Sequence, residues 1–597
     1  MSAGGLLAAF VLAKVVVLAS HVPGWSPWAP VAYLWQDVLV VIGLAAVDMT
    51  TRRIGLSPRV GRMLYWGMVV YAALSIPVGR ALATPLTWPM LRATRGPLAD
   101  SILLYATWTN AMLMASTIAV AAAPVVWRRR ITAGLKSCAT STTSPTRTAM
   151  TAALGVGAFM AVVGPVASAR VDTRGLDRNV LLALVASALP RMAAHPGTGD
   201  WRRSRFDQDA VEDLSTLRAI AGGRNVVFVS LESTAAQYLP LYGGEPGVAP
   251  HLGELARDAI VFEHAYAAYP ESIKGLFSIL CSVFPVFDST PNLYARVPCQ
   301  PLPGVLLQQG YRTGLFHSGR FDYLGMQSII RDRGYQTLED AGDIGGVHDS
   351  SFGVDEPTTV SRMLAWVDAT PKHQPFFLTY LPIAGHHPYE TPERGPFPDA
   401  DEIGRYRNAL HYGDAALGAL VDGFRARGLA ERTLWIVIGD HGEAFGQHEG
   451  NYGHTFFLYD ENVRVPLVIA APWAIQRPAR PRKVVSLVDL APTILDLLGI
   501  SVPADYQGRS ALDGTPRMAL FFADYSLGLV GLRDGQWKFV HELGSKRSRL
   551  FNLEHNPQET LDISSSHEDR ASWYRQHLLD WSAAQKAYVR SLALAHR

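Results

Sequence analysis

The segment 433–443, Thr-Leu-Trp-Ile-Val-Ile-Gly-Asp-His-Gly-Glu, constrains the fold more than any other stretch of the chain. Its run 434–438 is apolar without a break, which is typical of a strand buried on both faces of a parallel sheet. Asp440 and His441 follow this run directly. They therefore sit at the carboxyl end of a strand, the edge at which open α/β sheets bind ligands. The pair suits a metal ion, although an aspartate that only caps the turn is an alternative.

Two further apolar segments end in residues of the same chemical kind. Residues 225–231 are typical of a strand, followed by Glu232, and residues 375–383 are typical of another, followed closely by His386. Helical segments alternate with the strands, which predicts an α/β domain with a mostly parallel sheet and helices on both faces. Parallel strands end at one edge, so we expect these residues to share that edge with the pair described above.

The first 170 residues have a different character. Hydrophobic residues make up 48% of the chain and charged residues only 18%, which is unusually apolar for a soluble protein of 597 residues and directs attention to membrane spans. Runs of roughly spanning length lie at 6–21, 31–47, 63–78, 102–127 and 150–168. We therefore predict five transmembrane helices.

Basic residues in the loops predict the orientation of these helices. The second loop, 52–62, carries four arginines, and the fourth, 128–147, carries five lysines and arginines, whereas the first loop carries neither. The second and fourth loops are then cytoplasmic, the amino terminus is inside, and everything after the fifth span is outside. We expect a multi-pass protein of the cytoplasmic membrane with an extracytoplasmic catalytic domain. Lys14 and Asp37 fall at similar depth in the first two spans, which predicts an ion pair.

The sequence predicts four regions: a transmembrane domain at 1–170, an interfacial linker at 171–223, a catalytic domain at 224–515, and its carboxyl-terminal subdomain at 516–597. Apolar spacing within the linker predicts a helix at 207–220. The last region has the pattern of a small antiparallel sheet followed by a helix. A net charge of +2 argues against a nucleic-acid surface.

Three cysteines are too few for a disulfide scaffold. Cys281 and Cys299 both fall in the outer domain, where disulfides persist, so they either form a bridge or leave Cys281 as a buried thiol. Cys138 falls on the cytoplasmic side and should stay reduced.

Ser272 precedes a helical run that ends near Cys281. A serine at a helix start is usually an N-cap, but the same position suits a nucleophile, because helix amides favour anions. Lys274 adds a cation that could hold a phosphoryl or sulfuryl oxygen.

Taken in order, several segments resemble the sulfatase and alkaline-phosphatase-like superfamily. They are 225–233, 270–277, 385–389, 439–443, 453–466, 488–496 and 532–559. The amino-terminal spans and the Leu231-Glu232-Ser233 motif look most like the membrane-anchored phosphotransferase branch, which includes lipoteichoic acid synthases and phosphoethanolamine transferases. The chain departs from true sulfatases because residues 272–276, Ser-Ile-Lys-Gly-Leu, lack the Pro and Arg of the motif that is oxidised to formylglycine. We therefore expect a directly used hydroxyl.

The resemblance implies one divalent metal ion, with Zn or Mn favoured and Mg or Ca possible, held by Glu232, Asp440 and His441 with Ser272 as the fourth ligand. It implies that Ser272 is the nucleophile and that Lys274 assists catalysis.

The resemblance also assigns residues around the substrate. His386 matches the first histidine of the family's His-x-Pro element and would protonate the leaving alcohol, with His387 as the alternative. We expect His454, His387, His448 and Arg320 to contact the substrate.

The leading functional hypothesis is a transferase that moves a phospho-alcohol group, phosphoglycerol or phosphoethanolamine, from a membrane phospholipid to an envelope glycan or lipid through a covalent Ser272 intermediate. The alternative is a membrane-anchored hydrolase of phosphate or sulfate esters, which shares the first half-reaction. A catalytically inactive scaffold would have lost at least one ligand, and Glu232, Ser272, Asp440 and His441 are all present.

Overall fold

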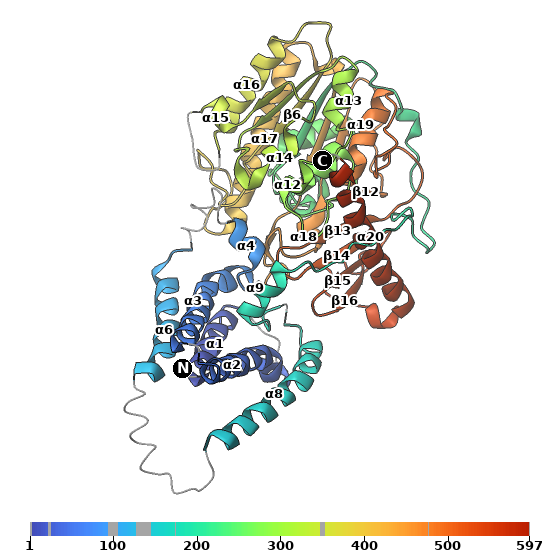
Figure 1. Ribbon diagram of the computed structural model, residues 1–597. Coiled ribbons are helices and arrows are strands. Elements are labelled where there is room, and N and C mark those ends of the chain that lie inside the picture. The colour runs from blue at the N-terminus through green and yellow to red at the C-terminus, as the bar shows by residue number, and fades with distance from the viewer. Residues whose placement is uncertain are drawn as a thin grey trace. The chain divides into compact units, whose positions relative to one another are not determined.

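The computed structural model describes residues 3–21, 26–55, 57–93, 105–126, 145–173, 175–346, 353–475 and 477–595. The chain forms two compact units, whose elements are labelled in Figure 1. The first comprises Met1–Pro190, Gly446–Tyr452 and Tyr525–Leu527. The second comprises Arg191–Phe445, Gly453–Asp524 and Gly528–Arg597.

A seven-stranded sheet with the order β2-β11-β7-β1-β6-β4-β5 lies at the centre of the second unit. Its strands are β1 (Asn225–Leu231), β2 (Ala259–Val261), β4 (Arg312–His317), β5 (Thr337–Glu339), β6 (Phe376–Leu381), β7 (Thr433–Gly439) and β11 (Leu467–Ala470). The five strands from β7 to β5 run parallel, and β11 is antiparallel to both of its neighbours. The predicted mostly parallel sheet is confirmed.

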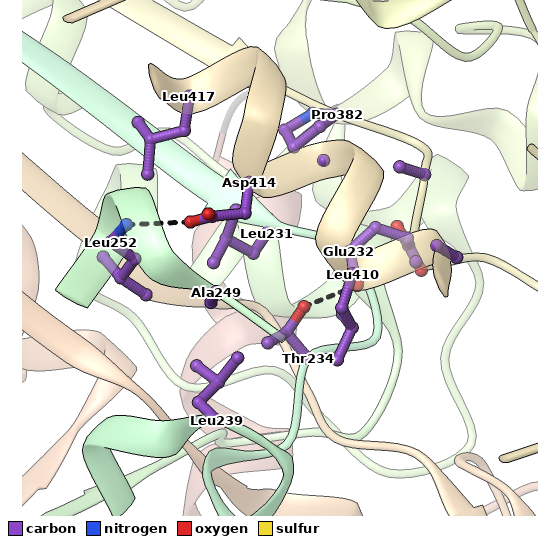
Figure 2. Close-up of a pocket in the computed structure, with 14 residues that line it drawn as sticks. Leu231, Glu232, Thr234, Leu239, Ala249, Leu252, Pro382, Leu410, Asp414 and Leu417 are labelled. Carbon is purple, nitrogen blue, oxygen red and sulfur yellow. Dashed lines mark hydrogen bonds between the residues drawn. The ribbon is translucent and has the colours of Figure 1, made fainter. Parts of the chain in front are cut away.

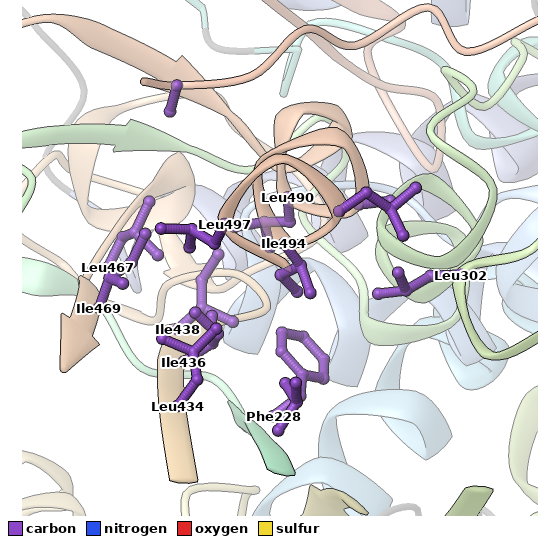
Figure 3. Packing of buried hydrophobic residues seen from close by; sticks show 14 of the residues in the cluster. Phe228, Leu302, Leu434, Ile436, Ile438, Leu467, Ile469, Leu490, Ile494 and Leu497 are labelled. Carbon is purple, nitrogen blue, oxygen red and sulfur yellow. The ribbon is translucent and has the colours of Figure 1, made fainter. Parts of the chain in front are cut away.

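Side chains alternate between the two faces of this sheet, and both faces are buried. On β1, Val226 and Phe228 enter one apolar cluster, which contains α13 (Leu302–Gln308) and α19 (Leu490–Leu498) and is shown in Figure 3. Val227 and Val229 enter the other cluster, with three helices. Those helices are α10 (Pro250–Leu255), α16 (Glu356–Asp368) and α17 (Glu402–Ala426). Each fully buried side chain of this size contributes about 1.5–3 kcal/mol, which explains the unbroken apolar runs.

Two smaller sheets complete the second unit. Strands β13 (Ala519–Ala523), β14 (Leu529–Asp534), β15 (Trp537–Glu542) and β16 (Ser548–Asn552) form an antiparallel sheet, and α20 (Glu568–Ala595) follows it. The predicted carboxyl-terminal pattern is confirmed. The other sheet has the order β10-β3-β12, with bounds Arg464–Val465, His264–Tyr266 and Val484–Ser486.

The helix predicted at 207–220 is wrong. Only Ser215–Leu217 forms a helical turn, of 3-10 type. Its apolar side chains pack on the sheet cluster, and backbone amides on either side bond to distant carbonyls, Leu214 to Leu512 and Ala219 to Asp496. These tertiary hydrogen bonds pair backbone groups that a helix would otherwise pair internally.

The first unit is helical. Its helices are α1 (Ala3–Leu18), α2 (Ala29–Arg53), α3 (Pro58–Leu82), α4 (Trp88–Ala93), α6 (Trp108–Val126), α8 (Pro145–Arg170) and α9 (Val180–Ala188). Within the described residues, two stretches are long and apolar enough to cross a membrane, Ala29–Thr51 and Thr151–Arg170. Two of the five predicted spans thus meet this criterion, and the five-helix arrangement stays a prediction. Residues 128–138, including Cys138 and most of the basic fourth loop, lie outside the described residues.

The predicted pair between α1 and α2 is confirmed. Lys14 Nζ lies 2.6 Å from Asp37 Oδ2, and Asn179 Nδ2 donates to Asp37 Oδ1 at 2.6 Å. Both ionised side chains are buried, so this pairing offsets the cost of placing them between apolar helices.

Cys281 and Cys299 form a disulfide that links positions 18 residues apart. Replacing both with serine should lower the free energy of unfolding by about 3 kcal/mol, because the bridge removes loop-closure entropy from the unfolded chain. Denaturant unfolding followed by tryptophan fluorescence measures this. Cys138→Ser is the matched control and should leave the midpoint unchanged. Three free thiols in the unreduced native protein would contradict the assignment.

Candidate metal and nucleophile site

The register of β1 and β7 brings two predicted ligands together. Leu231 pairs with Gly439, so the next residues, Glu232 and Asp440, follow the ends of neighbouring strands. The Asp440 amide donates to the Leu231 carbonyl at 3.2 Å. A Cβ atom at Gly439 would lie 2.4 Å from the backbone oxygen of Thr234, so this close approach requires glycine.

Glu232, Asp440 and His441 are buried, and their ligand atoms lie within 4.8 Å of one another. Nε2 of His441 lies 3.5 Å from Glu232 Oε1 and 3.8 Å from Asp440 Oδ2. Nδ1 of His441 lies 2.9 Å from the Gly442 carbonyl, to which it can donate. That bond fixes the tautomer and leaves the Nε2 lone pair for a ligand role.

Ser272 is the first residue of α11 (Ser272–Cys281), and the N-cap position belongs to Glu271. Its hydroxyl donates to Glu232 Oε2 at 2.8 Å and lies 3.2 Å from His441 Nε2. The N-cap alternative for Ser272 is therefore excluded, and the hydroxyl joins the carboxylate–imidazole cluster at a helix amino terminus.

The electrostatics of the cluster follow from three ionisable groups in one buried place. Burial raises the pKa of Glu232, but the hydrogen bond and charge of His441 outweigh it and hold that pKa well below its usual value. Burial and the charge of Glu232 raise the pKa of Asp440 to about 7. Burial lowers the pKa of His441, but the two carboxylates raise it to about 10. The cluster favours a positive charge. When no other cation is bound, protonated His441 carries that charge.

This donor set fits a divalent metal ion. Two carboxylates, one imidazole nitrogen and one hydroxyl form a mixed nitrogen and oxygen set, and like charges that repel each other gain from a shared cation. The three predicted ligands and the predicted nucleophile are thus brought together.

A buried acid that the sequence reasoning did not single out lies beside the cluster. Glu443 Oε2 lies 2.7 Å from His454 Nδ1, and Tyr389 donates its hydroxyl to Glu443 Oε1 at 2.8 Å. The rings of His454 and His441 lie 4.2 Å apart. Burial raises the pKa of Glu443, but His454 outweighs it and lowers the pKa. Its position two residues after His441, in the same loop, was the available signal.

His386 and His387 follow β6. Nδ1 of His386 lies 2.6 Å from the His387 carbonyl, and burial lowers its pKa although the charge of Glu232 opposes this. Burial lowers the pKa of His387 to about 4, and its ring contacts Tyr389 edge-on at 5.4 Å. The charge of His386 lowers the pKa of Glu232, so this histidine also lies near the cluster. The roles of both histidines stay predictions.

The other predicted site residues are placed differently. Lys274 is 5% exposed, and its Nζ donates to Asp524 Oδ1 at 3.0 Å, so its charge is already paired. Arg320 lies in the loop after β4, and His448 lies in the segment 446–452, which groups with the first unit. Catalytic assistance by Lys274 and substrate contact by Arg320 and His448 stay predictions.

A small cavity lies behind Glu232, as Figure 2 shows. Its volume is about 30 Å³, and its lining is mostly apolar, with Leu231, Leu239 and Leu417 among the residues. A space of this size holds only a few water molecules.

Comparisons with known proteins show similarity to sulfatase-like proteins over the second unit. Residues 224–500 match the sequence model of the sulfatase family, and residues 448–577 match the model described as the C-terminal region of N-sulphoglucosamine sulphohydrolase. The chain is 24% identical over 315 residues to the lipoteichoic acid synthase-like protein YvgJ of Bacillus subtilis, covering 49% of this chain and 51% of that protein. It is 30% identical over 184 residues to arylsulfatase K of Bos taurus, covering 28% and 34%. The chain thus spans about half, or less, of the curated relatives it matches.

Among solved structures, the lipoteichoic acid synthase LtaP from Listeria monocytogenes aligns with a TM-score of 0.53 at 18% identity, covering 64% of this chain and 96% of that one. A protein in the alkaline phosphatase superfamily from Vibrio parahaemolyticus aligns with a TM-score of 0.53 at 21% identity, covering 66% and 94%. At these identities the likeness shows the fold.

Metal binding to the purified protein should release protons. Below about pH 7 both Asp440 and His441 must lose a proton to become ligands, and between about pH 7 and 10 only His441 must. The apparent affinity should therefore rise about 100-fold per pH unit in the lower range and about tenfold in the upper one. Calorimetry with Zn²⁺ or Mn²⁺ in buffers of different ionisation enthalpy measures both quantities.

Asp440→Asn is the matched control for this titration. It should bind the metal more weakly and lose the steeper dependence below about pH 7, because the residue that supplied the second proton is gone. An affinity that does not change with pH in the unsubstituted protein would contradict the ligand assignment.

Proposed function

We propose that residues 224–500, which match the sequence model of the sulfatase family, form an enzyme domain of that family, and that the chain is a metal-dependent phosphotransferase. It moves a phospho-alcohol group, phosphoglycerol or phosphoethanolamine, from a membrane phospholipid to an envelope glycan or lipid. One observation carries the proposal: the Ser272 hydroxyl lies within hydrogen-bond distance of two predicted metal ligands, Glu232 and His441. A hydroxyl so placed is suited to attack phosphorus.

In the first half-reaction Ser272 Oγ attacks the phosphorus in line. A bond forms between Oγ and phosphorus while the bond to the diacylglycerol oxygen breaks, and the Ser272 proton passes to solvent. Glu232, Asp440 and His441 would hold a dication, with Zn or Mn favoured, which would lower the pKa of the hydroxyl and polarise the phosphoryl oxygen. The amino terminus of α11 supplies amides that favour the developing negative charge.

The leaving oxygen needs a proton. His386 is the predicted donor, with His387 as the alternative, and the position of His454, which contacts Glu443 and lies beside His441, supports it as a third candidate. A carboxylate–histidine pair of this kind holds the ring in one tautomer and stabilises its protonated form. In the second half-reaction an acceptor hydroxyl attacks phosphorus and gives its proton to the histidine that has donated one, while the bond between phosphorus and Ser272 Oγ breaks and Oγ takes up a proton from solvent.

A hydrolase is the second candidate function. It is favoured by the match of residues 448–577 to a sulphohydrolase region and by the likeness to arylsulfatase K. In that case water attacks the Ser272 intermediate. Against the sulfatase version, residues 272–276 lack the formylglycine motif.

The proposed location is the cytoplasmic membrane, with the second unit outside. Two helices long and apolar enough to span and the basic second loop support it. A membrane donor explains why such an enzyme is anchored, because the lipid headgroup is then close to the site.

Ser272→Ala should reduce transfer by about 10³-fold or more, since it removes the nucleophile. Membranes that contain the protein are incubated with headgroup-labelled phosphatidylglycerol or phosphatidylethanolamine, and transferred label is separated from free label. Ser278→Ala, on the same helix with its hydroxyl bonded to the Lys274 carbonyl, is the control and should keep its activity. Label released only as free phospho-alcohol or phosphate would favour the hydrolase. Full activity of Ser272→Ala would contradict both.

Glu443→Gln should lower kcat by about 10- to 100-fold with little change in KM, because it removes the charge that stabilises protonated His454 while keeping its size. Steady-state kinetics across the pH range give the profile of kcat. Glu431→Gln, an exposed acid, is the control. A Glu443→Gln variant with an unchanged profile would exclude His454 as the proton donor.

The topology makes a separate prediction. In a Cys138→Ser background, Thr198→Cys should react with a membrane-impermeant maleimide in intact cells, and Ser57→Cys should react only after permeabilisation. Both positions are exposed on the described chain. Equal labelling of the two positions in intact cells would contradict the orientation.

A further inference from the structure

A second cavity, which has a polar lining, lies in the second unit away from the cluster around Ser272. Its volume is about 670 Å³, and it is lined by segments around 208–212, 482–484, 516–517 and 533–536 together with His264 and Arg464. None of the predicted metal ligands or histidines of the catalytic cluster lines it. A volume of this order is typical of sites for small organic ligands.

The topology separates this cavity from the catalytic cluster. Arg533 pairs with Ala519, at one end of β13. Asp524, which binds Lys274 beside Ser272, follows the other end of the same strand. Five residues of extended chain span about 15 Å, so the cavity is a distinct place on the molecule.

The central observation is the environment of Arg533. Arg533 is only 3% exposed, and its Nε and Nη1 atoms are buried without a hydrogen-bond partner among the described residues. Asp460, an acid of the same cavity, is already engaged by Lys538 Nζ at 2.7 Å. A buried guanidinium with two unpartnered nitrogens is costly, and its planar fork of donors matches the oxygens of a phosphate or sulfate group.

Other donors surround Arg533. His264 Nδ1 and Arg517 Nε are also buried without a hydrogen-bond partner in the part of the chain that the structure describes, and both residues line the cavity. Burial and the charges of Arg533 and Arg464 lower the pKa of His264 to about 3, so the ring is neutral and offers one N–H. Gln208, Gln536 and Glu554 add groups that bind hydroxyls.

We propose that this cavity is a second ligand site, which binds the phosphate or sulfate ester group of a polyhydroxylated molecule, with Arg533 as its anchor. The oxyanion accepts from the unpartnered guanidinium atoms, and the amide and carboxylate side chains bind the hydroxyls. The site does not depend on the proposed function, because it uses neither the metal ligands nor Ser272.

The test uses the full chain in detergent, in a Ser272→Ala background and freed of metal, so that the catalytic cluster does not contribute. Calorimetry is run with inorganic phosphate, inorganic sulfate, glucose 6-phosphate and glucose. The parent should bind the anions at one site, and Arg533→Met should raise Kd about tenfold or more. Arg432→Met, at an exposed arginine, should leave Kd unchanged.

Tighter binding of glucose 6-phosphate than of phosphate would identify a sugar ester as the ligand, and equal binding would identify the anion alone. The first result supports the proposal, and the second would overturn its assignment of a polyhydroxylated ligand. An unchanged Kd in Arg533→Met, no anion binding by the parent, or glucose binding as tightly as its phosphate would overturn it.

A thermal measurement guards against misfolding of the variant. Phosphate should raise the Tm of the parent and not that of Arg533→Met, while the Tm of the variant without phosphate should be no lower. If Arg533→Met does not fold, Arg533→Lys replaces it, and this variant should show an intermediate Kd. A parent Tm that phosphate does not change would also overturn the proposal.

Discussion

Two buried carboxylates held side by side are the constraint on which the rest of the site depends. Glu232 and Asp440 are placed by the pairing of two parallel strands, so neither can move away without breaking the centre of the sheet. Their repulsion raises the pKa of one and makes a positive partner necessary. His441 meets that need with a proton in the metal-free protein, and a divalent ion would meet it better. The backbone register of the sheet therefore creates the affinity of this site for a cation, because it holds the two carboxylates together.

The surrounding elements position the groups that are predicted to react. α11 presents Ser272 to the carboxylates, and the buried pair between Lys274 and Asp524 ties that helix to the carboxyl-terminal sheet. The loop after β7 supplies Glu443, which orients His454. The predicted nucleophile and a candidate proton donor thus reach one centre from segments that are far apart in the sequence.

Sequence patterns predicted the parts of the structure that local physics decides. Unbroken apolar runs fixed the central strands, and the positions of Glu232, Asp440 and His441 at strand ends placed the ligands at one edge. The patterns failed where a distant contact decides, because the segment 207–220 is held by carbonyls nearly 300 residues away. Glu443 was missed because only the fold brings His454 to it. The five-span membrane arrangement is predicted from hydropathy and loop charge. Among the described residues, two helices are long and apolar enough to cross a membrane.

The central claim is that Glu232, Asp440, His441 and Ser272 converge on one divalent ion. X-ray diffraction recorded above and below the absorption edge of the bound metal tests it most directly. The claim predicts one strong anomalous peak within coordination distance, about 2.0–2.3 Å, of those side chains. A protein with full activity and no peak between them, or with its only peak elsewhere in the second unit, would contradict it.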